Sequence, residues 1–319
     1  MNILLLAEHR QNRLAAHFPR LLTAARQIGG PITVLVAGEA CLEVAYAAAQ
    51  FSGVTELLLA EHASQKEGVA ENLCALLLRL APEFTHFIAP ATPFGRHILP
   101  RLAASLQATT LTEIIGVIDA TTFIRPIHAG NAHCTLRLRP AFTAHPLCLT
   151  VRPTSFAPTP TQTQPAPIQK IDGKAESDLS RWIDQAPRQE ERPHLNSAQV
   201  VIAGGGGMEK AGNFDLITEA AHRLGAAVGA TRTAVDAGLA ASTQQIGQTG
   251  QIIAPKIYIA AGISGAIQHL AGIKDAKTIF AINNDPHAPI HTIADFSLTA
   301  DLFTALPEIL QELDRLQKE

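Results

Sequence analysis

The sequence predicts an α/β protein of two domains with mainly parallel sheets. Short apolar runs alternate with helical patterns in both halves of the chain, and a Pro-, Thr- and Gln-rich stretch over residues 153–167 lies between them. In the second half the strands repeatedly end in Gly, Ser, Thr, Asn or Asp. Strands that alternate with helices are typical of βαβ units and parallel sheets. At 319 residues the chain is long enough for two such domains, which we place at 1–195 and 196–319.

In the first half, apolar runs each precede a helical pattern, as βαβ units require. Strands are expected at 3–6, 32–37, 54–59 and 87–89, and helices up to 28 and at 41–51, 69–80 and 95–106. The pattern then changes, because Ala129-Gly130-Asn131 separates two extended runs as the turn of a hairpin would. With 147–151 as a third extended run, we expect a small antiparallel section to close this domain.

The second half repeats one unit, a strand that runs into a polar or glycine-rich turn before a helix. Strands are expected at 198–203, 226–230, 257–261, 278–282 and 296–299. After the first strand a helix places Phe214, Ile217, Ala221 and Leu224 on one face, and a last helix begins near Leu302. In open parallel sheets the carboxyl edge of the strands binds ligands. This domain is therefore predicted to be Rossmann-like, with its site at that edge.

Composition excludes several other classes of protein. The formal net charge of −3 argues against a general nucleic-acid binder, which needs a basic surface. No apolar run reaches the ~18 residues of a membrane span, and the first residues lack the features of a signal or transit peptide, so we expect a cytoplasmic protein. The four cysteines lack metal-ligand spacing and are expected to be free thiols. No nucleophile elbow, carboxylate pair or metal cluster stands out.

Two glycine-rich turns are the main candidates for a binding site. Residues 204–207 and 262–266 each lie between a strand and a helix, where backbone N–H groups and the helix dipole favour an anion. Each alone could be a tight turn, but two in one domain suggest a dinucleotide with its pyrophosphate across the edge. Residues 245–250 form either a surface turn or a loop that binds a heterocycle. On pattern alone, Arg232 is a solvated charge and His269 a satisfied helix residue.

Longer motifs resemble the electron-transfer flavoprotein alpha family. In the second half these are VGATRTAVDAG at 228–238, GQTG at 247–250, YIAAGISGAIQHLAG at 258–272 and AINNDP at 281–286. The first half resembles the family more loosely, through TPFGR at 92–96 and RPIHAGNA at 125–132. The resemblance covers essentially the whole second domain, and its motifs there are highly specific.

The resemblance implies that the second domain binds FAD. It places the Thr249 hydroxyl near flavin N5, His269 near the C2 carbonyl and Arg232 beside the isoalloxazine, where a cation would stabilise the negative charge of reduction. The full set of residues that it implies for the cofactor site is Gly206, Thr231, Arg232, Ile246, Gly247, Gln248, Thr249, Ser264, Gly265, Ala266, Ile267, Gln268, His269, Asn283, Asp301 and Leu302.

One position departs from the family pattern. The family usually has Gly-Gly-Arg-Gly at the first turn, whereas this chain has Gly204-Gly205-Gly206-Gly207. An Arg that would help to hold the cofactor is therefore missing at Gly206, although backbone N–H groups can still bind phosphate.

The resemblance also implies partners and a role. The first domain would contact a beta subunit, which would hold AMP, and the pair would carry electrons without a substrate of its own. Electrons would come from flavin dehydrogenases such as acyl-CoA dehydrogenases of fatty acid β-oxidation and pass to a membrane quinone oxidoreductase. Two alternatives remain: a nucleotide-dependent oxidoreductase acting on a small substrate, and, because of Gly206, a non-redox assembly module that has lost FAD.

Overall fold

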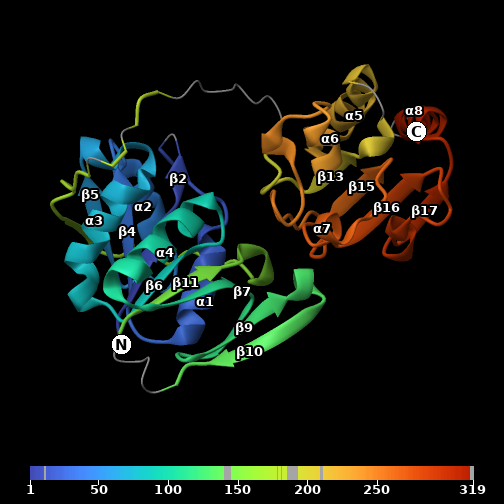
Figure 1. Cartoon of the computed structure of the whole chain (residues 1–319). Helices are drawn as coiled ribbons and strands as arrows, with labels where there is room; N and C mark the ends of the chain where they lie inside the picture. Colours follow the sequence, from blue (N-terminus) through green and yellow to red (C-terminus); the bar gives the residue numbers. More distant parts are fainter. Residues whose placement is uncertain are drawn as a thin grey trace. The chain divides into compact units, whose positions relative to one another are not determined.

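The chain contains two compact units, Met1–Ala186 and Pro187–Glu319. A computed structural model describes residues 1–10, 12–139, 145–177, 179–180, 182–184, 193–208 and 211–316 (Figure 1). Each unit has its own parallel sheet and its own hydrophobic cores. The predicted α/β class with mainly parallel sheets is confirmed.

The first unit is built on a seven-stranded sheet in which every neighbouring pair of strands is parallel. In sheet order the strands are β12 (Ile168–Lys170), β5 (Glu56–Glu61), β4 (Ile32–Gly38), β1 (Ile3–Leu6), β6 (His86–Pro90), β11 (Leu147–Val151) and β7 (Thr109–Ile114). The helices are α1 (Phe18–Ile28), α2 (Leu42–Ala49), α3 (Ala70–Leu80) and α4 (Pro93–Leu106).

Helices cover both faces of this sheet. Ile3 and Leu5 of β1 pack in one core with α1 and α2, and Leu4 and Leu6 pack in the opposite core with α3 and α4. Side chains alternate between the faces of a strand, so a strand covered on both faces reads as a continuous apolar run. This explains why the predicted strands at 3–6 and 32–37 carry almost no polar residues.

The antiparallel section is present, but its membership differs from the prediction. β9 (Thr122–Ile127) and β10 (Ala132–Arg137) form the expected hairpin around the turn His128–Gly130. The third strand is β8 (Gly116–Asp119), which pairs with β9. The run at 147–151 was wrongly grouped with them: β11 is a fully buried parallel strand between β6 and β7. A short ribbon of β2 (His9–Arg10) and β3 (Arg13–Leu14) completes the strands described in this unit.

The second unit has a five-stranded parallel sheet in the order β14-β13-β15-β16-β17. The strands are β13 (Val200–Gly204), β14 (Ala227–Ala230), β15 (Ile257–Ala261), β16 (Thr278–Asn283) and β17 (Phe296–Thr299). The helices are α5 (Ala211–Leu224), α6 (Arg232–Asp236), α7 (Ile267–Leu270) and α8 (Leu302–Leu316). The predicted helix face is confirmed, since Phe214, Ile217 and Ala221 of α5 are buried and Leu224 packs against the same core.

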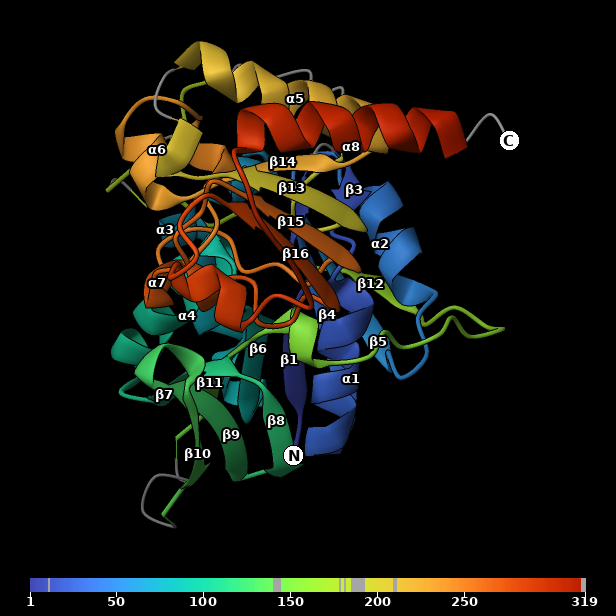
Figure 2. The same ribbon diagram turned by 90° about the vertical axis from the view of Figure 1, so that its right-hand side faces the viewer.

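The two faces of the second sheet are covered differently. α5 and α8 lie side by side over one face, as Figure 2 shows. The other face is covered largely by loops, through Ile246, Ile253, Ile263 and Ile290. The chain passes from β13 out to β14 and then back across β13 to β15. The strand order therefore reverses at β13 and β15, which is where open α/β sheets form their ligand crevice.

Two further observations concern membrane spans and cysteines. Among the described helices, none combines the length and the apolar character that crossing a bilayer requires. The four cysteines are free, with Cys41, Cys74 and Cys148 buried and Cys134 partly exposed.

The motif TPFGR contains a glycine that the packing of the first unit requires. A Cβ atom on Gly95 would lie 2.0 Å from the carbonyl oxygen of Pro90 and 2.9 Å from the Cβ of Ala89. Gly95→Ala should therefore reduce the free energy of unfolding by at least about 2 kcal/mol, because α4 cannot move away from β6 without opening the core. Urea unfolding followed by far-ultraviolet circular dichroism measures this. Ser105→Ala, at an exposed position of α4, is the control, and an equal effect of both changes would contradict the packing argument.

Candidate functional site

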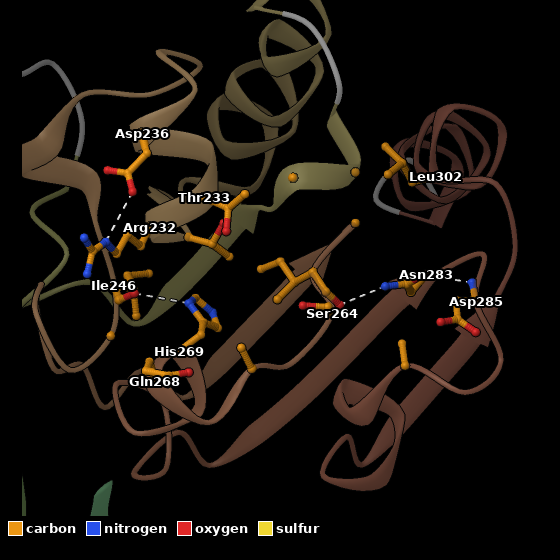
Figure 3. Close-up of a pocket in the computed structure, with 18 of the residues that line it drawn as sticks. Arg232, Thr233, Asp236, Ile246, Ser264, Gln268, His269, Asn283, Asp285 and Leu302 are labelled. Atoms are coloured by element: carbon orange, nitrogen blue, oxygen red, sulfur yellow. Dashed lines mark hydrogen bonds and ion pairs between the residues drawn. The ribbon is translucent and has the colours of Figure 1, made fainter.

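A large cavity lies at the carboxyl edge of the second sheet (Figure 3). Its volume is about 1050 Å³, at the upper end of the roughly 300–1,000 Å³ of small-molecule sites. It is lined by the segments that follow β13, β14, β15, β16 and β17. The lining residues are Gly206, Gly207, Thr231, Arg232, Thr233, Asp236, Ile246, Gly247, Gln248, Thr249, Gly262, Ile263, Ser264, Ala266, Gln268, His269, Asn283, Asn284, Asp285, Ala288, Asp301, Leu302 and Phe303.

The structure brings together all but two of the residues that the sequence predicts for the site. Gly265 is buried behind the lining, where its φ is +88° and a Cβ would lie 2.4 Å from the backbone nitrogen of Ile290. The side chain of Ile267 is exposed but does not line the cavity. Nine further residues line the cavity: Gly207, Gly262 and Ile263 belong to the two glycine-rich turns that the sequence analysis singled out, whereas Thr233, Asp236, Asn284, Asp285, Ala288 and Phe303 were not assigned to the site. Thr233, Asn284 and Phe303 adjoin a predicted residue, and Thr233, Asp236, Asn284 and Asp285 lie within the motifs at 228–238 and 281–286, so these were the available signals.

Two glycine turns meet at the centre of the cavity. The N–H of Gly205 donates to the carbonyl of Ala261 (3.0 Å), and that of Gly207 donates to the carbonyl of Gly262 (3.1 Å). A Cβ on Gly205 would lie 2.2 Å from the Gly262 oxygen. A Cβ on Gly206, by contrast, would meet only Thr233, at 3.3 Å from its Cγ2. Packing therefore requires glycine at Gly205 but leaves room for a side chain at Gly206.

The polar side chains at the β16 end of the cavity hold the loops in place. Asn283 donates from Nδ2 to the carbonyl of Ile263 (2.9 Å), and its Oδ1 accepts from the N–H of Asp285 (2.9 Å). Asp301 accepts at Oδ1 from the N–H of Phe303 (2.8 Å) and so caps the start of α8. These residues position backbone around the cavity, and the Asp301 carboxylate retains its second oxygen for a further bond.

The opposite end carries a cation, Arg232. Thr231 caps α6 by accepting at Oγ1 from the N–H of Ala234 (3.3 Å), and Arg232 follows it. The Arg232 Nε lies 3.2 Å from the Oδ2 of Asp236, and the two side chains are 68% and 64% exposed. An ion pair this exposed contributes at most about 1 kcal/mol, so Arg232 can leave Asp236 for a ligand at little cost.

The loop after Ile246 is joined to the start of α7. The N–H of Gln248 donates to the carbonyl of Gln268 (2.8 Å). Gly247 has a φ of +139°, and a Cβ there would lie 2.8 Å from the same carbonyl oxygen. The Thr249 hydroxyl accepts from Nε2 of Gln245 (2.9 Å). The side chains of Gln248 and Thr249 are exposed and line the cavity.

His269 is the buried ionisable group of the lining. Its Nδ1 lies 3.1 Å from the carbonyl oxygen of Ile246, and its Nε2 lies 2.7 Å from the hydroxyl of Tyr258. Burial lowers the pKa of His269 to about 4, and the Ile246 carbonyl offsets part of that effect. The imidazole is therefore neutral at pH 7, and a hydrogen bond from either nitrogen to a ligand requires the exchange of an existing one.

Paired substitutions test the contact between the glycine turns. Gly205→Ala should lower the free energy of unfolding by at least about 2 kcal/mol, because the new methyl group meets backbone atoms that cannot rotate away. Gly206→Ala should change it by less than about 1 kcal/mol, since its Cβ has space. Thermal and urea unfolding of both variants measure the difference, and an equal loss of stability in both would show that the turns do not meet in this way.

Two family models match the chain. One, described as the electron transfer flavoprotein FAD-binding domain, matches residues 194–274, and one described as the electron transfer flavoprotein domain matches residues 3–176. Together they cover most of both units.

Relatives match the chain along nearly its whole length. The electron transfer flavoprotein subunit alpha of Pseudomonas aeruginosa is 44% identical over 309 residues, which are 97% of this chain and 99% of the relative. The protein of that name from Paracoccus denitrificans is 41% identical over 313 residues, 98% of this chain and 100% of the relative. The mitochondrial subunit alpha of Dictyostelium discoideum is 41% identical over 328 residues, 98% of this chain and 91% of the relative.

Proposed function

This chain belongs to the electron transfer flavoprotein alpha-subunit family, and from that premise we propose that the cavity of its second unit is where it holds FAD. Proteins of this family carry electrons and have no substrate of their own, and FAD is their cofactor. The observation that carries the proposal is the convergence of the family's motifs, from separate strand ends, on one cavity of about 1050 Å³.

The residues present fit a dinucleotide. The lining residues spread along the edge of the sheet, with Arg232 and His269 at one end and Asn283 and Leu302 at the other (Figure 3). Gly206 and the exposed Ser264 lie on the turns between these ends, where the backbone can approach a pyrophosphate. We assign the pyrophosphate to these two turns.

The two ends of the cavity suit the two halves of FAD. At the β14 end, Gln248 and Thr249 offer amide and hydroxyl groups to a heterocycle, and Arg232 offers a cation. At the β16 end, Asn283 and Asp301 offer oxygens that can accept from ribose hydroxyls. We therefore place the flavin at the β14 end and the adenosine at the β16 end.

The charges that line the cavity give Arg232 a role in balancing the negative charge of a reduced cofactor. The charged side chains of the described lining are Arg232, Asp236, Asp285 and Asp301, and His269 is neutral. Bound FAD supplies the redox chemistry through its ring system. Arg232 is the cation of this lining that can balance the negative charge added by reduction, and its weak pairing with Asp236 leaves it free to do so.

The alpha subunit of this family pairs with a beta subunit. We propose that the first unit contacts it, that AMP is held by the beta subunit, and that the pair accepts electrons from flavin dehydrogenases such as acyl-CoA dehydrogenases. A membrane quinone oxidoreductase would be the acceptor. The carrier role requires the cofactor to be reached by both partners, and the cavity's flavin end, with the exposed Arg232, Gln248 and Thr249, supports that.

Spectroscopy of the heterodimer tests this function. The chain is co-expressed with its beta subunit, purified, and titrated with an acyl-CoA dehydrogenase and its substrate while the visible spectrum is recorded. We expect flavin absorbance that bleaches only when the dehydrogenase is present. A purified heterodimer without flavin would favour the assembly module, and turnover of a small substrate by the chain alone would favour the oxidoreductase.

Removing the cation should make reduction harder. Arg232→Ala is expected to lower the midpoint potential of the bound FAD by on the order of 30 mV, which for two electrons corresponds to about 1.4 kcal/mol. Spectroelectrochemical titration of the heterodimer measures this shift. Arg223→Ala, which removes an exposed arginine paired with Glu219 and Asp314, is the control. Equal potentials in wild type and Arg232→Ala would remove Arg232 from this role.

Adding a cation at the first turn should strengthen binding of the cofactor. Gly206 has room for a side chain, and the described lining of its cavity contains three aspartates and one arginine. Gly206→Arg is therefore expected to slow the loss of FAD on dilution several-fold, since a guanidinium binds phosphate in a bidentate way. Fluorescence of released flavin gives the rate, with Gly206→Ala as the matched control. If Arg and Ala behave alike, the side chain at this position does not contact the cofactor.

A further inference from the structure

Tyr258 places a polar group in an apolar core directly behind the cavity. Its side chain on β15 is completely buried, in the core that also contains Val201, Ile253 and Ile273. Its hydroxyl lies 2.7 Å from Nε2 of His269. A buried phenol is costly unless its O–H has a partner, and phenylalanine would fill the same space without that requirement. The hydroxyl therefore has a role that packing alone does not explain.

The hydrogen bonds of His269 specify where its proton lies. The Ile246 carbonyl can only accept, so Nδ1 of His269 must carry the proton and donate to it. A neutral imidazole then has a lone pair at Nε2, and the Tyr258 hydroxyl must donate to that lone pair. Every donor and acceptor in this chain of three groups is satisfied by one arrangement of protons.

The tyrosine also opposes a positive charge on the ring. A protonated His269 would donate from Nε2, so the O–H of Tyr258 would lose its acceptor in a core where no solvent reaches it. Burial acts in the same direction, lowering the pKa of His269 and raising that of Tyr258. The neutral ring is therefore favoured both by burial and by the direction of the hydrogen bond.

Charged groups lie on five segments that line the cavity or adjoin Tyr258 and His269 in the chain. α6 carries Arg232 and Asp236, which pair with each other, and the segment before β15 carries Lys256. The segment after α7 carries Lys274, Asp275 and Lys277, and the far side of the cavity carries Asp285 and Asp301. The shift in the pKa of His269 comes from burial and from the Ile246 carbonyl, so the neutral ring does not depend on these charges.

We propose that Tyr258 is a positioning residue of the cofactor site, which holds His269 neutral with its Nδ1 proton on Ile246 and thereby fixes the loop that carries Gln248 and Thr249. His269 is connected to this loop in two ways. Its partner Ile246 immediately precedes the Gly247 turn, and the Gln248 N–H donates to the carbonyl of Gln268, the neighbour of His269. The inference rests on the proposed function, since that function makes this cavity the FAD site.

Nitrogen NMR of the histidine rings tests the proposal. The full-length chain, purified with its beta subunit, is labelled with ¹⁵N-histidine, and the signal of His269 among the thirteen histidines is assigned from its absence in His269→Gln. In the wild type we expect a single tautomer with the proton on Nδ1. In Tyr258→Phe we expect the proton to stay on Nδ1, because the Ile246 carbonyl still accepts it, and the pKa of His269 to rise by about one unit, because Nε2 has lost the donor that favours the neutral form.

A matched control separates this effect from a general loss of a tyrosine. The chain has two tyrosines, and Tyr46, in the first unit, is half exposed. Tyr46→Phe should leave the His269 spectrum unchanged. A wild-type spectrum with the proton on Nε2 would overturn the proposal even if Tyr258→Phe did not fold, and so would an unchanged pKa of His269 in a folded Tyr258→Phe.

Hydrogen exchange tests whether Tyr258 and His269 position the loop that carries Gln248 and Thr249. Flavin absorbance tests the FAD site separately from the role of Tyr258. In Tyr258→Phe we expect amide hydrogen exchange at Gln248 and Thr249 to accelerate at least several-fold, whereas exchange in α5 should not change. Exchange at wild-type rates in that loop would overturn the positioning role. Flavin absorbance is recorded in the same samples. Its absence from wild type would contradict the FAD site alone, while an NMR spectrum that does not respond would contradict the role of Tyr258 alone.

Discussion

The site depends on the close approach of two backbone turns, one after β13 and one after β15. Gly205 and Gly207 donate to the carbonyls of Ala261 and Gly262, and no side chain fits at Gly205, where a Cβ would lie 2.2 Å from the Gly262 oxygen. The two strands are neighbours in the sheet although β14 lies between them in the chain. Because the turns bind each other, the carboxyl edge of the sheet presents backbone rather than side chains at the middle of the cavity, which suits a bulky anion.

Around these turns, several polar side chains of the cavity already form hydrogen bonds within the protein. Thr231 and Asp301 cap helices, Asn283 bonds the backbone at both ends of its amide, and His269 uses both ring nitrogens. The site is thus preorganised, and cofactor binding does not have to order these loops. Arg232 is held more loosely, because its ion pair with Asp236 is largely exposed. A fixed pocket with one adjustable cation is consistent with a carrier that tunes its cofactor without transforming a substrate.

Much of the fold could be predicted from local pattern, but the pairing of strands could not. Leu147–Val151 is an apolar run that reads the same in an antiparallel or a parallel sheet, and its neighbours β6 and β7 are set by packing across the whole unit. For the site, glycines and polar residues at strand ends were sufficient to predict a ligand at the carboxyl edge of the second sheet. The identity of the ligand as FAD and the roles of individual residues came from the family resemblance. Asp285 and Phe303 were not predicted, because neither is at a strand end: Asp285 lies two residues beyond β16, and Phe303 lies in the first turn of α8. Tyr258 looks like an ordinary strand residue until its hydroxyl is seen on His269.

The central claim is that FAD lies in the cavity at the carboxyl edge of the second sheet. A crystal structure of the purified heterodimer tests it most directly. We predict electron density for FAD that passes between the Gly206 turn and Ser264, with the flavin beside Arg232, Gln248 and Thr249. FAD bound elsewhere in the heterodimer, with this cavity filled only by solvent, would contradict the account.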